Sequence, residues 1–219
     1  MSEATTREPT YRLIQSDPSG RQVRDALADL FAGDGTIYLI VGFFTYNGYR
    51  AFRDDVISFL ERSADNELKI VAGPSSDQFS PKIASDLSSI DTNDQVEIYK
   101  YRRGLHAKLY LREGSDPMLI LGSANLTQVG FRYNLELGIE ISGGDPNHPH
   151  IAPFIEWAEE LVETAAPMTR RDLLTPVQIW NSAVNWTNKG RLLPAPYIAK
   201  RLVPILMLMI IVALIAGWI

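Results

Sequence analysis

The chain has 219 residues, a formal net charge of −5 and no cysteine. Without cysteine it can form neither a disulfide framework nor a thiolate metal site. The excess of acidic residues argues against broad, charge-driven binding of nucleic acid, although it leaves room for a local basic site. The length suits one domain with a sizeable core and a short appendage.

Helical and strand-like patterns alternate in the first half of the chain. Residues 1–10 are polar, and we expect them to be flexible. Apolar side chains at helical spacing predict helices at 20–31, 48–62 and from Ser80-Pro81 onward. Runs of β-forming residues predict strands at 36–44, 68–72 and 96–99. The first of these strands is apolar throughout, as if covered on both faces, and the alternation predicts a parallel α/β arrangement.

The pattern changes after residue 99. Three strands with short links are predicted at 106–111, 118–121 and 135–141, and an amphipathic helix at 151–164. Together the elements predict an α/β fold, a mixed sheet flanked by helices, in one domain over residues 11–165. Residues 166–201 contain four prolines and no clear periodicity, so we interpret them as a connector.

The chain ends in an apolar run, Leu202 to Ile219, that has no charged side chain. As a helix it would span about 27 Å, close to the roughly 30 Å core of a bilayer. Lys200 and Arg201 precede the run and Trp218 stands near its end, where interfacial anchors belong. A buried or oligomer-forming helix is the alternative, but such a helix normally has a polar face. We therefore predict a single-pass C-terminal membrane anchor, with no signal peptide and the preceding domain in the cytoplasm.

Two short clusters in the second half carry the chemistry. His106 and Lys108 are two residues apart on a predicted strand, so their side chains should share a face. Gly122, Ser123 and Asn125 follow the next strand, where glycine allows close backbone approach and the polar side chains can donate to phosphate oxygens. A neutral imidazole can attack phosphorus while a cation and hydrogen-bond donors stabilise the charge of the transition state.

Basic and acidic side chains around His106 extend this hypothesis. The only dense basic stretch of the acidic region surrounds the histidine and favours an anion site: Lys100, Arg102, Arg103, Lys108 and Arg112. A carboxylate is needed behind the imidazole to fix its tautomer, and Glu136 and Glu113 are the candidates. His148 and His150 form a second histidine pair, which we interpret as surface residues rather than a metal site.

The order of these residues resembles the signature of the phospholipase D superfamily. The resemblance rests on His106-x-Lys108, on Gly-Ser-x-Asn at 122–125 and on Asn134-x-Glu136. It covers about residues 10–165 and is closest to the restriction-endonuclease and helicase-associated nuclease branch. Glu113 stands where the family usually has Asp, and the eight-residue gap before Gly122 is slightly long.

The resemblance implies a role for each of these residues. His106 resembles the nucleophile that forms a phosphohistidine, and Lys108 and Asn125 resemble phosphate ligands that Ser123 and Gly122 support. Glu136 resembles the acid that orients the histidine, and Asn134 and Glu113 take orienting or structural places. Apart from the resemblance, we expect flanking phosphates of a nucleic-acid substrate to be bound by Arg102, Arg103, Arg112 and Arg132. The family needs no metal or other cofactor.

The family mechanism uses two histidines, but this chain has one His-x-Lys motif and no internal repeat. The expected solution is a homodimer whose two-fold axis pairs the two copies of His106. The first predicted function is a metal-independent nuclease, with DNA favoured as substrate. The alternative is a membrane-anchored phospholipase D-type lipid phosphodiesterase or transphosphatidylase, and a third is a membrane scaffold without activity.

Overall fold

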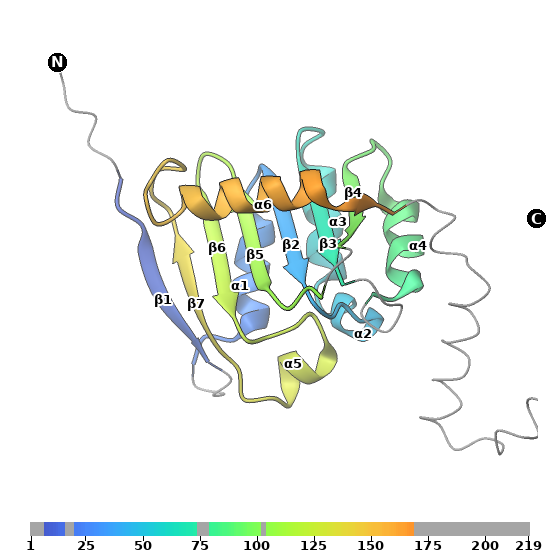
Figure 1. The fold of residues 1–219 in the computed structure, drawn as a ribbon, viewed down its shortest axis with the longest axis horizontal. Coiled ribbons are helices and arrows are strands. Elements are labelled where there is room, and N and C mark those ends of the chain that lie inside the picture. Colours follow the sequence, from blue (N-terminus) through green and yellow to red (C-terminus); the bar gives the residue numbers. More distant parts are fainter. Residues whose placement is uncertain (1–6, 16–19, 74–78, 102–103, 169–219) are drawn as a thin grey trace, which may run out of the picture. The chain divides into compact units, whose positions relative to one another are not determined.

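The computed structural model describes residues 7–15, 20–73, 79–101 and 104–168 (Figure 1). The strands are β1 (Thr10–Gln15), β2 (Thr36–Val41), β3 (Glu67–Ala72), β4 (Val96–Lys100), β5 (Lys108–Glu113), β6 (Met118–Gly122), β7 (Leu137–Ser142) and β8 (Ala166–Pro167). The helices are α1 (Val23–Ala32), α2 (Tyr46–Tyr49), α3 (Arg53–Arg62), α4 (Pro81–Ile90), α5 (Gln128–Arg132) and α6 (Ala152–Thr164).

All eight strands form one mixed sheet in the order β1-β7-β6-β5-β2-β3-β4-β8. β2, β3 and β4 are parallel, as the alternation of helices and strands predicts. β5 pairs antiparallel with β2, and β6, β7 and β1 continue the antiparallel half. Parallel neighbours need a long crossover, so the short link between β5 and β6, residues 114–117, permits only antiparallel pairing of these two strands. The predicted α/β fold, a mixed sheet flanked by helices, is confirmed.

Helices cover both faces of the sheet. Side chains of α1, α3 and α4 pack with one set of strand residues, and α6 packs with the other set. Figure 1 shows α6 crossing the strands on the near face. In β2 the five residues from Ile37 to Val41 are all buried, so the prediction that this strand is covered on both faces is confirmed.

Several elements differ from the sequence prediction, among them β8, which begins the predicted connector. The helix predicted at 48–62 is two helices, α2 and α3, because Phe52 leaves the helical conformation (φ −134°) and its ring stacks on those of Phe31 and Phe44. β1 was not predicted, since only one of its residues, Ile14, is buried and gives no pattern, and pairing with β7 supplies its structure. α5 was missed because it has only five residues.

Arg112 corrects a functional prediction. It lies four residues along β5 from Lys108, roughly 13 Å in an extended strand. Its buried guanidinium donates to the carbonyl oxygens of Asp29 and Leu30 at the end of α1, at 2.8 and 2.7 Å, and to that of Asp116. These bonds satisfy helix-end carbonyls that would otherwise lack partners. Arg112 is therefore structural, and the prediction that it binds a substrate phosphate is wrong.

The strand register brings four segments of chain to one edge of the sheet. β2 and β6 end at this edge, and β5 and β7 begin there, because Val41 pairs with Lys108 and Gly122 pairs with Gly138. Figure 1 shows this edge beside α2 and α5. Residues just outside these four strand ends are therefore neighbours in space.

The predicted membrane anchor falls outside the described part of the chain. Within the described ranges, no helix is both long and apolar enough to cross a bilayer. Residues 202–219 and the connector that precedes them, apart from 166–168, lie beyond these ranges. The anchor and the domain boundaries stay predictions.

Candidate active site

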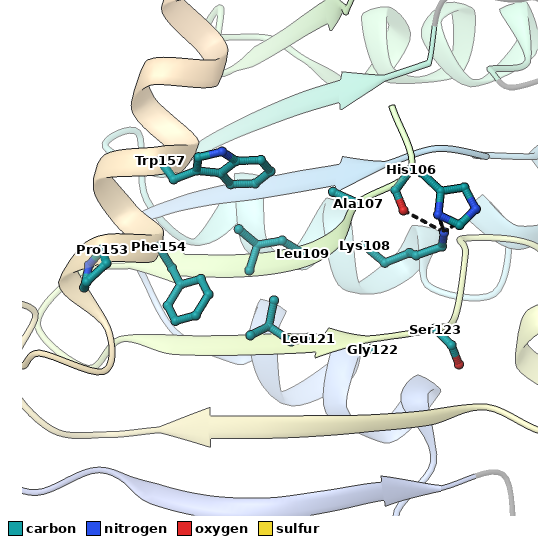
Figure 2. A pocket seen from close by; sticks show the side chains of 10 residues that line it. All are labelled: His106, Ala107, Lys108, Leu109, Leu121, Gly122, Ser123, Pro153, Phe154 and Trp157. Carbon is teal, nitrogen blue, oxygen red and sulfur yellow. Dashed lines mark hydrogen bonds between the residues drawn. The ribbon is translucent and has the colours of Figure 1, made fainter. Parts of the chain in front are cut away.

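His106 and Lys108 meet at the start of β5. His106 is exposed and lies just before the strand rather than within it, whereas Lys108 is its first residue and is 9% exposed. The Nζ of Lys108 donates to the backbone oxygen of His106 at 2.8 Å and lies 3.2 Å from the imidazole Nδ1 (Figure 2). The predicted pairing of the two side chains is confirmed, although His106 does not belong to the strand.

Gly42, directly after β2, lets the segment before His106 approach closely. A Cβ atom at this position would lie 2.7 Å from the carbonyl oxygen of Leu105 and 3.7 Å from Oδ1 of Asn125. No side chain can occupy that space without moving the backbone. Gly42 was not among the predicted site residues, because a glycine at a strand end gives no signal of what packs against it.

The Gly122–Asn125 segment is fixed from several sides. Gly122 faces β7 so closely that a Cβ atom would lie 2.7 Å from the carbonyl oxygen of Leu137. The buried hydroxyl of Tyr110 donates to the carbonyl oxygen of Ala124. Oδ1 of Asn125 accepts from the backbone N–H of Phe43 at 3.2 Å, and this contact ties the segment to the end of β2. With Oδ1 used in this way, the Nδ2 amide of Asn125 is the group that can donate to a ligand.

Glu136, just before β7, is a buried carboxylate at the same edge. Its Oε2 accepts from the Ser123 hydroxyl, and its Oε1 accepts from Nδ2 of Asn134 at 2.9 Å. The backbone N–H of Leu137 also donates to the Ser123 hydroxyl oxygen, at 3.1 Å. Ser123, Asn134 and Glu136 thus form one hydrogen-bond network, and its carboxylate is close enough to influence the charge of Lys108.

Glu113 lies at the opposite end of β5 from Lys108. Its Oε2 accepts a hydrogen bond from the hydroxyl of Tyr38 at 3.1 Å. Glu113 therefore cannot orient His106, and of the two candidate carboxylates only Glu136 lies at the edge that holds the histidine.

The remaining predicted residues have different outcomes. Arg102 and Arg103, and the side chain of Arg132, lie outside the described residues. His148 is buried, contrary to our expectation of a surface residue, and its ring hydrogen-bonds to the Glu8 carboxylate and the backbone N–H of His150. Its carbonyl oxygen also accepts from Ile151 and Ala152 at the start of α6.

A pocket of about 710 Å³ opens beside the His106–Lys108 pair. One wall carries His106, Lys108, Gly122 and Ser123, and the rest is apolar. The apolar part is formed by Leu109 and Leu121 of the sheet and by Pro153, Phe154 and Trp157 of α6. Figure 2 shows the α6 side chains facing the two leucines, with the His106–Lys108 pair at the other end.

A protein-family model matches most of the chain. The model described as "Cardiolipin synthase, PLD-like domain" matches residues 12–160. The chain belongs to the phospholipase D-like family. Members of this family are phosphodiesterases, and the chain is thus a hydrolase of phosphodiester bonds. No curated protein sequence matches it.

Solved structures of phospholipase D-like proteins share the fold. Nuc from Salmonella typhimurium, a phospholipase D family member, has a TM-score of 0.57 at 15% identity, covering 74% of this chain and 99% of Nuc. NucT from Helicobacter pylori has a TM-score of 0.54 at 17% identity, covering 74% of this chain and 100% of NucT. Phosphatidylserine synthase from Haemophilus influenzae has a TM-score of 0.60 at 14% identity, covering 82% of this chain and 45% of that enzyme.

The electrostatics of this phospholipase D-like site depend on Lys108. Burial lowers the pKa of its ammonium group below the usual value of 10.5, and the nearby Glu136 carboxylate opposes this shift. A protonated Lys108 and the Nδ2 amide of Asn125 can together bind the oxygens of a phosphodiester placed against His106. Deprotonation of Lys108 would remove the cation from this arrangement.

The alkaline limb of the pH–rate profile should therefore report Lys108. We expect kcat/KM for a chromogenic phosphodiester to decrease as pH rises through the pKa of the Lys108 ammonium group. Because that pKa is lowered, the decrease should begin before pH 10.5 is reached. Lys108→Arg should move this limb to higher pH, because a guanidinium stays charged, and should cost about tenfold in rate through altered geometry. Lys69→Arg on β3, where the lysine pairs with Glu67, is the matched control. An alkaline limb that Lys108→Arg leaves in place would show that another group controls it.

Proposed function

We propose that the chain is a metal-independent nuclease that forms a phosphohistidine on His106, with DNA as the favoured substrate. The observation that carries this proposal is the exposed imidazole of His106, held beside the Lys108 ammonium and the Asn125 segment at one sheet edge. These groups can supply a nucleophile, a cation and hydrogen-bond donors without a metal ion. The chain covers nearly the full lengths of Nuc and NucT but only 45% of phosphatidylserine synthase, and this difference supports nucleic acid over lipid as the substrate.

In the proposed first step, an imidazole nitrogen of His106 attacks phosphorus, and a P–N bond forms as the P–O bond to the leaving oxygen breaks. A second histidine on the opposite side gives its proton to that oxygen. Water then attacks phosphorus, returns a proton to the second histidine and releases His106. Lys108 and Asn125 hold the equatorial oxygens, while Glu136 fixes Ser123 and Asn134 beside them.

The proposed activity predicts a specific substrate pattern. The full-length protein in detergent and EDTA should cleave single-stranded or duplex DNA and release no headgroup from mixed phospholipid vesicles. His106→Ala should lose at least about a thousandfold in rate, because no other group supplies the nucleophile. RNA in the same panel tests the DNA preference. Headgroup release without nucleic-acid cleavage would contradict the nuclease proposal.

The proposed mechanism needs two histidines, and the described site holds only His106. The second histidine therefore has to come from a second copy of the chain. An apolar row beside the site offers a surface for it. Leu13, Ile139 and Leu121 lie opposite one another across β1, β7 and β6, and the row ends at Leu109 in the pocket. Leu13 is 59% exposed and Ile139 is 38% exposed. Two-fold packing on this row would place the two sites next to each other.

Mixed dimers test this arrangement. Coexpression of wild-type and His106→Ala chains at equal levels should halve the activity per wild-type chain, to about 50%, because half of the wild-type chains then sit in dead heterodimers. Coexpression with Arg7→Ala, a surface change far from the site, should cause no loss. Undiminished activity per wild-type chain with His106→Ala would mean that each chain works alone.

A lipid phosphodiesterase is the second candidate, and the apolar part of the 710 Å³ pocket favours it. Phe154 and Trp157 could accommodate hydrocarbon next to a phosphodiester bound at Lys108. The vesicle arm of the substrate panel distinguishes this activity from nucleic-acid cleavage.

A further inference from the structure

A second, polar pocket lies between α2 and α5. It has a volume of about 310 Å³ and is lined by Asn47, Arg50, Ala51, Gln128 and Phe131. Asn47, Arg50 and Gln128 are exposed, while Phe131 is half-buried against Phe52. The pocket thus presents two amide side chains, one guanidinium and one aromatic ring.

This pocket is built directly onto the active-site segment. α2 follows β2, and α5 follows the Gly122–Asn125 segment (Figure 1). The backbone N–H of Thr45 donates to the carbonyl oxygen of Leu126 at 3.0 Å, and a Cβ atom on Gly48 would lie 2.1 Å from that oxygen. Arg50 is one helical turn, about 5 Å, beyond Tyr46, whose carbonyl oxygen accepts from the Arg50 N–H. The two pockets are therefore linked by short, tightly packed chain.

Arg50 differs from the other arginines whose side chains the structure describes. Each of the others forms an ion pair with Asp or Glu: Arg7, Arg12, Arg21, Arg24, Arg53, Arg62 and Arg112. No such pair is formed by Arg50 within the described residues, although acidic residues outnumber basic ones in the chain. A guanidinium without a carboxylate keeps its charge available for an external anion, and its planar donors suit phosphate.

We propose that the α2–α5 pocket binds a nucleotide that neighbours the scissile phosphodiester. Arg50 binds the phosphate of that nucleotide, and the amides of Asn47 and Gln128 donate hydrogen bonds to its phosphate or base. The ring of Phe131 contacts the base or sugar. Such contacts hold a strand in register without specifying its sequence. This inference rests on the proposed nuclease function and identifies how that site extends along its substrate.

The test compares two substrates and two arginines. For a short single-stranded DNA oligonucleotide, Arg50→Ala should raise KM about tenfold, since a charge-assisted bond to phosphate is lost. The salt dependence of log KM should also weaken by about 0.7 in slope, the value for one lost phosphate contact on a single strand. For bis(4-nitrophenyl) phosphate, which has no second phosphate, kcat/KM should not change. Gln128→Ala should raise the oligonucleotide KM by a smaller factor.

Arg7→Ala is the matched control, because it removes an exposed arginine that pairs with Asp116. It should leave both substrates unaffected. If the wild-type protein cleaves the oligonucleotide and Arg50→Ala behaves like Arg7→Ala, the nucleotide pocket is ruled out and the nuclease proposal stands. If the wild-type protein cleaves bis(4-nitrophenyl) phosphate but no oligonucleotide, the nuclease proposal fails and the pocket assignment fails with it. An equal loss on both substrates would show that Arg50 acts on the catalytic centre instead.

Discussion

The antiparallel pairing of β5 between β2 and β6 is the constraint on which the site depends. Because β5 runs against both neighbours, its first residue, Lys108, lies at the edge where β2 and β6 end. The His106–Lys108 motif and the Gly122–Asn125 segment therefore meet although strands β5 and β6 separate them. β7 begins at the same edge and adds Glu136. A parallel β5 would place these groups at opposite ends of the sheet.

Close backbone contacts give this edge its precision. Gly42 and Gly122 each stand where a Cβ atom would lie 2.7 Å from a carbonyl oxygen. The buried Tyr110 hydroxyl holds the Ala124 carbonyl oxygen, and burial raises the pKa of this phenol, so it stays a donor. The side chains of the proposed site lie on an exposed edge and are thus supported by close backbone contacts beneath them, which suits the preorganised site that transition-state stabilisation requires.

The sequence predicts those parts of the fold and site that depend on local pattern. The apolar run of β2 predicts a strand that is covered on both faces. The His106-x-Lys108 spacing indicates the phospholipase D-like family. Long-range pairing is not visible in this way, and so β1 was missed and Arg112, which stands in a basic run, was assigned to phosphate. Its true partners, the carbonyl oxygens of Asp29 and Leu30, lie about 80 residues away in sequence. The ion-pair pattern that distinguishes Arg50 likewise exists only in three dimensions.

The proposed covalent bond between the imidazole of His106 and phosphorus can be trapped by rapid quenching without acid, during turnover of internally ³²P-labelled DNA by the full-length protein. If the bond forms, the protein should carry a label that is stable to alkali and labile to acid, maps to the peptide containing His106 and is absent from His106→Ala. Rapid turnover with no labelled histidine, or turnover that survives the replacement of His106, would rule out the phosphohistidine.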